Sequence, residues 1–389
     1  MDVDKVKGIL MQDLASTARA SVPRKDMLST GSTLLNMACT GYPDCGFFKG
    51  HYFWLVGDSS SGKTFLALTC LAEAARNKEF DNYRFILDDV EGGSLMNIER
   101  FFGAAVAQRL ESPETGKDGE PINSHTIEEF YYHLHDAMGN NRPCIYILDS
   151  MDALSSEAEQ DAFEENKALA EKGKDAKGSY GDGKAKKNKA GIRQMLADIH
   201  DTKSIVIIIS QTIDKLNAGP FEEKTTVAGG RSLKFFAGLQ IWSKVGAPIK
   251  VKVRGKNRTI GVDSVIRIRK NRSTGRDRQI VVPIYYSLGF DDVGGCVDYL
   301  VEEGHWKTAT RKKSREDRET TKKDVDEDRA DEKRSRGIDA KEFSFIGNRD
   351  DLIEHIEKEG LEFDLRQLVS EVWHTIEDEC TPNRKPRYV

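Results

Sequence analysis

The residues from Gly57 to Thr64 combine two glycines, a lysine and a hydroxyl at a spacing suited to phosphate binding. The apolar run Tyr52 to Val56 precedes them, and a helical pattern follows. Such a turn directs backbone N–H groups and the positive end of a helix toward one point. Lys63 is expected to reach the β- and γ-phosphates of a nucleotide, and Thr64 to bind the Mg²⁺ that bridges them.

A phosphate loop of this kind requires a second acid for the metal, at the end of a neighbouring buried strand. Asp149 directly follows the apolar run Cys144 to Leu148 and is the candidate. Because Ser150 follows it in place of a glutamate, the group that activates water must come from elsewhere. The acidic strand end after Leu87 supplies Glu91 as the preferred base and Asp89 as the second choice.

A polar amide, Gln211, ends the apolar run Ser204 to Ile209. In an open α/β sheet, ligands bind at the carboxyl ends of the strands. Gln211 is therefore a candidate sensor of the γ-phosphate, although glutamines at strand ends also serve as structural hydrogen-bonding groups.

An alternation of short apolar runs and helical patterns between residues 28 and 305 predicts an α/β fold with a mostly parallel central sheet. The expected strands are 52–56, 84–87, 144–148, 204–209, 239–245, 265–269 and 279–284, the last three as an antiparallel extension of the sheet. The expected helices are 63–77, 96–107, 126–138 and 192–200. Thr126 and Glu129 have the spacing of a capping box.

The bulk composition indicates a soluble, cytoplasmic protein. The net charge of −5 excludes an overall basic field, so a nucleic-acid surface must be local. The six cysteines show no paired spacing, which suits reduced thiols. The N-terminus lacks the pattern of a signal peptide, and the longest apolar run, 205–209, is too short to cross a membrane.

Composition also suggests the domain boundaries. An amphipathic helix is expected within residues 1–27, an ATPase-type core over 28–308, a charged linker over 309–340 and a small helical module over 341–389. Residues 111–125 are expected to form a surface insertion. Residues 164–191, rich in lysine and glycine, predict a mobile basic loop that could follow a nucleic-acid backbone or could merely be solvated.

The order of these motifs resembles the RecA-type strand-exchange recombinases of bacteria and phages. The resemblance covers residues 28 to 305 and is carried by the phosphate loop, Glu91, the stretch 148–159, Ser210-Gln211 and the segment 225–237, with sequence TTVAGGRSLKFFA. It implies an ATP- and Mg²⁺-dependent DNA-stimulated ATPase that forms filaments on single-stranded DNA and exchanges strands with a homologous duplex.

The resemblance also implies roles for individual residues. Glu91 would activate water, Gln211 would couple the nucleotide to a DNA loop at 212–228, and Lys270 and Arg272 would reach the nucleotide of an adjacent subunit. Lys63 completes the expected catalytic set. The expected nucleotide contacts are Gly57, Asp58, Ser59, Ser60, Ser61, Gly62, Lys63, Thr64, Phe65, Ile98 and Asp149, with Thr64 and Asp149 at the metal. The expected DNA contacts are Lys184, Lys186, Lys187, Lys189, Arg193, Lys215, Gly229, Gly230 and Arg231.

The chain departs from the family pattern in three places. Ile98 occupies the position of an aromatic residue that covers adenine, the first DNA loop is longer and more basic, and the region after Trp306 does not resemble the usual C-terminal lobe. In the family the N-terminal helix packs on a neighbouring subunit, which favours homo-oligomers here. Two alternatives stay open: a ring-shaped helicase or related motor with the same core, and a non-catalytic recombination mediator.

Overall fold

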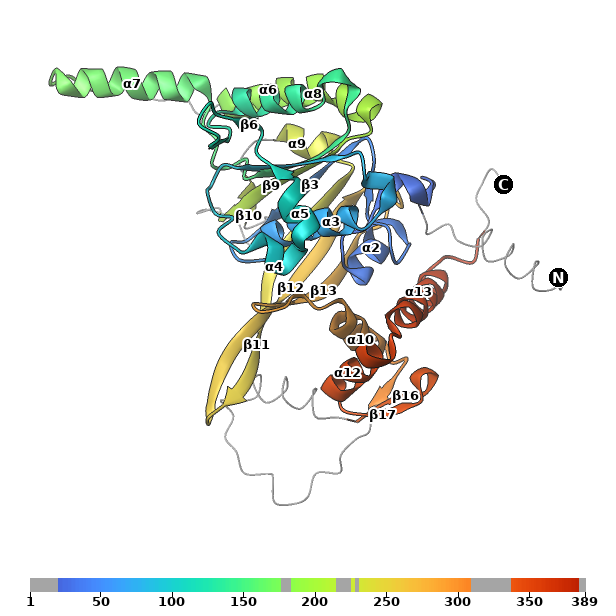
Figure 1. Ribbon diagram of the computed structural model, residues 1–389. Coiled ribbons are helices and arrows are strands. Elements are labelled where there is room, and N and C mark those ends of the chain that lie inside the picture. Colours follow the sequence, from blue (N-terminus) through green and yellow to red (C-terminus); the bar gives the residue numbers. More distant parts are fainter. Residues whose placement is uncertain (1–19, 176–182, 215–224, 228–230, 309–336, 385–389) are drawn as a thin grey trace. The chain divides into compact units, whose positions relative to one another are not determined.

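A computed structural model describes residues 20–175, 183–214, 225–227, 231–308 and 337–384 (Figure 1). The described chain forms two compact units, one within residues 19–290 and one within 291–384. The sequence placed residues 291–308 in the core, whereas the structure groups them with the C-terminal unit. The expected N-terminal helix lies almost wholly in residues 1–19, outside the described chain.

The larger unit is built on one mixed sheet with the strand order β14-β13-β12-β11-β3-β9-β8-β4-β5, and β10 pairs with β9. The pairs from β11 through β3, β9, β8 and β4 to β5 are parallel, and the remaining pairs are antiparallel. This arrangement confirms the predicted parallel centre and antiparallel extension. The strands are β3 (His51–Gly57), β4 (Arg84–Asp89), β5 (Leu110–Glu111), β8 (Cys144–Asp149), β9 (Ile205–Asp214), β10 (Thr225–Val227), β11 (Leu239–Val253), β12 (Lys256–Asn271), β13 (Arg278–Tyr285) and β14 (Gly289–Phe290).

The central strands are buried on both faces, which explains their nearly continuous hydrophobicity. Successive side chains point to opposite faces. On one face, Tyr52, Tyr146 and Ile208 pack into a core that also contains Phe130 and Ile192 from two helices. The alternate residues of the same strands are equally buried on the other face, so the sheet has a helical layer on each side.

Figure 1 shows α6, α8 and α9 on one side of the central strands and α2 to α5 on the other. Their bounds are α2 (Thr33–Thr40), α3 (Lys63–Ala75), α4 (Ile98–Phe102), α5 (Ala104–Arg109), α6 (Ile127–Ala137), α7 (Glu157–Glu171), α8 (Gly183–Thr202) and α9 (Arg231–Phe236). The single helix expected over 96–107 is two short helices, because Gly103 has φ 91° and interrupts it. The capping box of Thr126 and Glu129 begins α6 as predicted.

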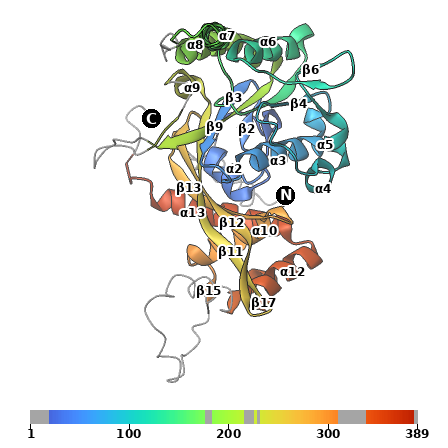
Figure 2. The same ribbon diagram turned by 90° about the vertical axis from the view of Figure 1, so that its left-hand side faces the viewer.

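The mobile loop predicted over residues 164–191 is wrong at both ends. Ser156 and Glu159 form a capping box that begins α7, which continues to Glu171, and α8 begins at Gly183. Alanine and glutamate dominate the first segment, and alanine and lysine the second; all three residue types favour helix, in α7 even without a buried face. Helix α7 has no buried residue and projects from the unit (Figures 1 and 2). Residues 176–182 lie outside the described chain.

Short elements complete the larger unit. Within the predicted insertion 111–125, β6 (Glu114–Thr115) and β7 (Pro121–Ile122) form an exposed two-stranded hairpin. At the other end of the unit, β1 (Met27–Leu28) pairs with β2 (Phe47–Phe48). Single 3₁₀ turns are η1 (Arg24–Asp26), η2 (Lys78–Phe80) and η3 (Gly139–Asn141).

The C-terminal unit contains α10 (Asp292–Glu302), α12 (Arg349–Glu359) and α13 (Glu362–Glu379). It also contains a sheet of β15 (Lys307–Thr308), β16 (Ile338–Ala340) and β17 (Phe345–Gly347), with the 3₁₀ turn η5 (Lys341–Phe343) before β17. The expected linker therefore ends before Ile338. The buried Arg349 donates to both carboxylate oxygens of Asp298, at 2.7 and 2.9 Å, and this pair ties α12 to α10.

We predict that Thr126→Ala lowers the free energy of unfolding by about 1 kcal/mol, because the Thr126 hydroxyl caps α6. Thr126→Ser keeps the hydroxyl and should retain most of the stability. Urea unfolding curves of the three proteins measure the difference. An equal loss in both variants would show that packing of the Thr126 methyl group, and not the cap, supports this end of α6.

Candidate functional site

The phosphate loop joins β3 to α3 as the sequence predicts, and its two glycines are required by their surroundings. A Cβ on Gly57 would lie 2.2 Å from the carbonyl oxygen of Ser243 on β11. Gly62 has φ 88°, and a Cβ there would lie 2.3 Å from Ile284. The loop is therefore held against the sheet at a distance that side chains would prevent.

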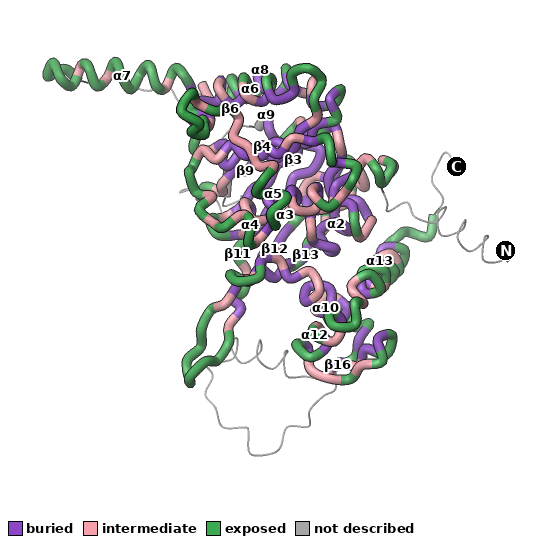
Figure 3. The backbone as a smooth tube through the Cα atoms, viewed as in Figure 1, coloured by how far each residue is buried: buried purple, intermediate pink, exposed green. Residues whose placement is uncertain are grey.

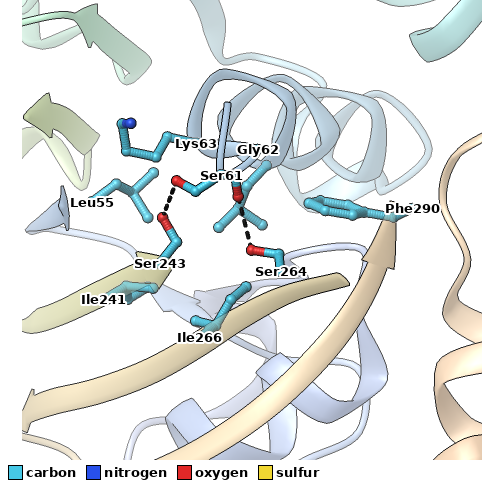
Figure 4. Close-up of a pocket in the computed structure, with 10 residues that line it drawn as sticks. Leu55, Ser61, Gly62, Lys63, Ile241, Ser243, Ser264, Ile266 and Phe290 are labelled. Carbon is cyan, nitrogen blue, oxygen red and sulfur yellow. Dashed lines mark hydrogen bonds between the residues drawn. The ribbon is translucent and has the colours of Figure 1, made fainter. Parts of the chain in front are cut away.

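Two serines on the sheet support the loop from below (Figure 4). Ser61 and Ser243 share a hydrogen bond of 2.7 Å between their hydroxyls, and the Ser264 hydroxyl donates to the Ser61 carbonyl at 2.8 Å. A hollow beside them is lined in part by aliphatic side chains such as Leu55 and Ile241. Since the serine hydroxyls that line it bond to one another or to the loop backbone, we regard the hollow as part of the loop's support and not as a ligand site.

Lys63 lies at the first position of α3, and its ammonium group folds back on the loop. Nζ donates to the carbonyl of Gly57 at 3.0 Å and to that of Asp58 at 2.7 Å. Among the described residues, no carboxylate oxygen lies within ion-pair distance of Nζ. Burial lowers the pKa of Lys63, and nearby carboxylates oppose this effect. The charge is thus held by neutral groups that an anion could replace.

Thr64 and Asp149 meet as expected of metal ligands. The Thr64 hydroxyl donates to Asp149 Oδ2 at 2.5 Å. Burial raises the pKa of Asp149 from 3.8 to about 6, and the negative charges of Glu91 and Asp89 act in the same direction. Two adjacent oxygen donors in an acidic surrounding fit Mg²⁺, which prefers oxygen ligands.

Glu91 lies at the centre of a hydrogen-bond network at the carboxyl edge of the sheet. Its Oε1 accepts from the hydroxyl of Ser150 and, at 3.0 Å, from the side-chain amide of Gln211. The backbone N–H of Gln211 donates to Asp152 Oδ2 at 2.6 Å. The structure thus brings the preferred base and the proposed sensor into direct contact, and the carboxylate keeps an exposed position.

Asp89 is occupied in a different way. Its two carboxylate oxygens accept from the backbone N–H groups of Gly93, at 3.1 Å, and Ser94, at 3.0 Å. The carboxylate therefore holds the turn after β4, as a structural acid does. This geometry favours Glu91 over Asp89 as the base.

Two further residues of the network were missed by sequence analysis. The Thr212 hydroxyl donates to Asp58 Oδ1 at 2.6 Å, so the residue after Gln211 bonds directly to the phosphate loop. Asp152 Oδ1 is buried and has no hydrogen-bond partner among the described residues, which leaves an acceptor for a water or a ligand. The residue types of Thr212 and Asp152 alone did not indicate these contacts, because the residues that they contact lie far away in the sequence.

The two predicted nucleotide contacts beyond the loop differ in their surroundings. Phe65 packs against Phe101, Phe102 and Phe290, with ring centroids 5.6, 4.8 and 5.5 Å apart, so its ring is part of an aromatic cluster. Ile98 is the first residue of α4 and is half-buried. The remaining loop residues, Ser59 and Ser60, are exposed.

Lys270 and Arg272 converge on one end of α9. Lys270 Nζ donates to the carbonyls of Lys234, at 3.0 Å, and Phe235, at 2.6 Å, and Arg272 Nη2 donates to the Phe235 carbonyl at 2.5 Å. Burial and the neighbouring cations lower the pKa of Lys270 to about 8. The last carbonyls of a helix attract cations, which explains this position in the single chain.

The predicted DNA contacts are placed on helices or lie outside the described chain. Lys184 and Lys187 lie on α8 and form ion pairs with Glu159, at 3.3 Å, and Glu128, at 2.9 Å. Lys186, Lys189 and Arg193 are exposed on the same helix. Lys215, Gly229 and Gly230 lie outside the described residues, as does the side chain of Arg231, the first residue of α9.

The second predicted DNA loop, 212–228, is shorter than expected. Thr212 to Asp214 belong to β9 and pair antiparallel with β10, so both ends of the segment are strands. The structure thus connects the end of β9, with Gln211, directly to a two-stranded extension.

Among the described residues, no helix combines the length and the apolar character that a membrane span requires.

Comparisons with known proteins agree with this arrangement. A family model described as the RecA N-terminal domain matches residues 138–291. Protein RecA of Streptococcus agalactiae serotype III is 26% identical over 339 residues, which cover 83% of this chain and 78% of that protein. Protein RecA of Streptococcus parasanguinis is 27% identical over 339 residues, or 83% and 77% of the two chains.

We predict that Asp149→Asn stabilises the protein at pH 8 by up to about 3 kcal/mol, since each pKa unit corresponds to about 1.4 kcal/mol. The raised pKa means that ionised Asp149 opposes folding at high pH. As the pH falls from 6 toward 4, the native carboxyl becomes protonated and the advantage of asparagine should shrink. Urea unfolding of both proteins at pH 8 and pH 5 tests this, and a difference independent of pH would contradict it.

Proposed function

The chain is a distant homologue of the RecA proteins, and we propose that it is an ATP-dependent recombinase that forms filaments on single-stranded DNA and pairs them with a homologous duplex. The observation that carries this proposal is the contact of Gln211 with Glu91. The same strand, β9, runs to Asp214, inside the segment 212–228 that resembles the family's second DNA loop, and the GGRSLKFF sequence follows at 229–236. A nucleotide-dependent change at Glu91 would thus be transmitted to DNA.

ATP would bind with its phosphates at the loop between Gly57 and Thr64. Lys63 would exchange its two carbonyl acceptors for phosphate oxygens, and the α3 N-terminus would add its positive end. Thr64 and Asp149 would hold Mg²⁺, which would neutralise charge on the phosphates. The buried, unpaired oxygen of Asp152 would accept a hydrogen bond from a water near the ion.

Glu91 would orient and deprotonate the attacking water. Its Oε1 is held by Ser150 and Gln211, which fixes the position of the carboxylate while the group stays exposed. A base held in this way needs no rearrangement when the water arrives. Loss of the γ-phosphate would release Gln211 and with it the strand that leads to the DNA segment.

Lys270 and Arg272 would complete the site of an adjacent subunit. In the single chain both cations bond to neutral carbonyls at the end of α9, and burial together with the charges of Arg272 and Lys234 lowers the pKa of Lys270. A phosphate anion from a neighbour would be a stronger partner for both. Catalysis would then depend on assembly, and a non-closing contact of this kind generates a filament. We also propose a cytoplasmic location.

The deciding experiment is the ATPase rate of the purified protein with and without single-stranded DNA. We expect single-stranded DNA to stimulate ATP hydrolysis by the wild type. The Glu91→Gln variant should bind ATP with unchanged affinity, but its rate of ATP hydrolysis should fall at least about 100-fold, which is the usual contribution of a general base. Asp89→Asn serves as the matched control, because Asp89 holds the turn.

Lys63→Ala should lose ATP binding itself, in contrast to the Glu91 variant. A rate independent of DNA in the wild type would favour the non-catalytic mediator. Normal turnover by Glu91→Gln would remove Glu91 from its proposed role, and closed rings that unwind duplex DNA would favour the helicase alternative.

Mixing experiments test the shared site. Lys270→Ala subunits added to wild type should inhibit more steeply than dilution, because each inactive subunit also disables a neighbour. Lys244→Ala, which removes an exposed lysine of β11, is the control and should leave activity unchanged. If activity falls in simple proportion to the wild-type fraction, the site is complete within one subunit.

A further inference from the structure

The strands β11 and β12 continue beyond the sheet as a two-stranded ribbon. We call residues 250–259 the basic ribbon. Its cross-strand pairs run from Lys250 opposite Thr259 to Val253 opposite Lys256. The last residue of β12 to pair with β13 in this direction is Gly261, so the ribbon strands pair with each other alone. Each strand extends about 13 Å past the sheet, at about 3.3 Å per residue.

The charge of the basic ribbon is opposite to that of the chain. Its ten residues contain five cations and no carboxylate, whereas the whole chain has a net charge of −5. The cations are Lys250, Lys252, Arg254, Lys256 and Arg258. An acidic protein that binds a polyanion must gather its positive charge locally, and this ribbon is such a place.

Four of the five cations are available to a partner. Lys252, Arg254, Lys256 and Arg258 are exposed, and none has a side-chain hydrogen bond or ion pair among the described residues. In Figure 3 the backbone tube at the end of this ribbon is coloured as exposed. The charges of these four residues are therefore not used to hold the described fold together.

The turn of the basic ribbon carries an unusual residue. Arg254 and Gly255 form a two-residue connection with φ 52° and 74°. Hairpins of this type favour asparagine followed by glycine, because the first position requires a left-handed backbone. An arginine at that position adds a cation at the tip at a cost in backbone strain, and strained residues of this kind cluster at binding sites.

The two faces of the ribbon differ, because paired residues lie on the same face. Lys250 and Lys252 share one face with Thr259 and Asn257. On the other face, Arg258 and Lys256 lie opposite the exposed Val251 and Val253. Positive charge is thus present on both faces, as it must be for an element that is surrounded by a polyanion on two sides.

The sequence of the ribbon favours one class of partner. Single-stranded nucleic acid is held by aromatic side chains on which bases stack, and the ribbon contains none. A two-stranded antiparallel ribbon fits the major groove of B-DNA, and its cations then contact the phosphates on both walls. Lysines also protect exposed strand edges from aggregation, but that role requires neither the arginine at the turn nor one sign of charge.

We propose that the basic ribbon is a binding surface for the phosphate backbone of duplex DNA, separate from the phosphate loop and from the two segments assigned to single-stranded DNA. This inference rests on the proposed function, because duplex DNA is the second substrate of a recombinase. The ribbon would hold the duplex by charge and shape, without reading its sequence.

The test is duplex binding by a variant with Lys252→Gln, Arg254→Asn, Lys256→Gln and Arg258→Gln. The asparagine suits the turn, so thermal unfolding should match the wild type. The control variant, with Arg76→Gln, Lys78→Gln, Lys117→Gln and Arg142→Gln, removes the same charges from exposed positions elsewhere in the unit. Fluorescence anisotropy with a labelled 30-base-pair duplex gives the dissociation constant between about 50 and 200 mM salt.

We expect the ribbon variant to bind the duplex at least about 10-fold more weakly than the control, with a salt slope smaller by about 3, since each phosphate contact contributes about 0.9. ATPase stimulation by single-stranded DNA should be unchanged. Equal duplex affinity and slope in the two variants would overturn the proposal, as would a loss confined to binding of polyglutamate or of a second copy of the chain. A wild type without DNA-stimulated ATPase but with ribbon-dependent duplex binding would refute the recombinase and support the ribbon.

Discussion

An excess of negative charge at one edge of the sheet governs the structure of the candidate site. Parallel strands end at the same edge, so the acids that follow β4 and β8 are brought beside the phosphate loop. Glu91, Asp149 and Asp152 lie in the field of a single lysine, Lys63. Burial raises the pKa of Asp149, and the nearby carboxylates of Glu91 and Asp89 raise it further. A bound cation together with a polyphosphate would relieve the repulsion among these carboxylates. The contacts of the site hold the carboxylates where such ligands would bind.

The same edge joins the site to the rest of the unit. Strand β9 places Gln211 on Glu91 and Thr212 on Asp58, so two successive residues connect the candidate base and the phosphate loop. The side chain proposed to respond to the phosphates therefore lies on a strand whose continuation carries the proposed DNA segment. Coupling between the candidate base and the phosphate loop requires no long chain of residues, because the end of β9 contacts both of them.

The sequence predicted the central strands and the phosphate loop well, because buried parallel strands are continuously apolar and the loop has a specific spacing. It did not predict α7 and the first part of α8. Lysine and glycine between residues 164 and 191 indicated a loop, whereas the capping box at Ser156 and the abundance of alanine and glutamate produce helix.

Contacts between distant segments were also beyond the sequence. Ser243 and Ser264 bond to Ser61 from positions 182 and 203 residues away in the sequence, and Thr212 reaches Asp58 from the neighbouring strand β9. Such pairs depend on strand order and register, which the apolar pattern of one strand does not determine. The convergence of Lys270 and Arg272 on the last carbonyls of α9 belongs to the same class.

Helix α7 has a consequence for how the protein responds to its surroundings. Its fifteen residues bury no side chain, and Phe163 is 66% exposed. A helix of this length is at the limit of independent stability in water. Its helical content is thus supported mainly by local propensity, the Ser156 cap and surface contacts such as the ion pair of Glu159 with Lys184. Amide hydrogen exchange along α7 would therefore report on any molecule that comes to cover it.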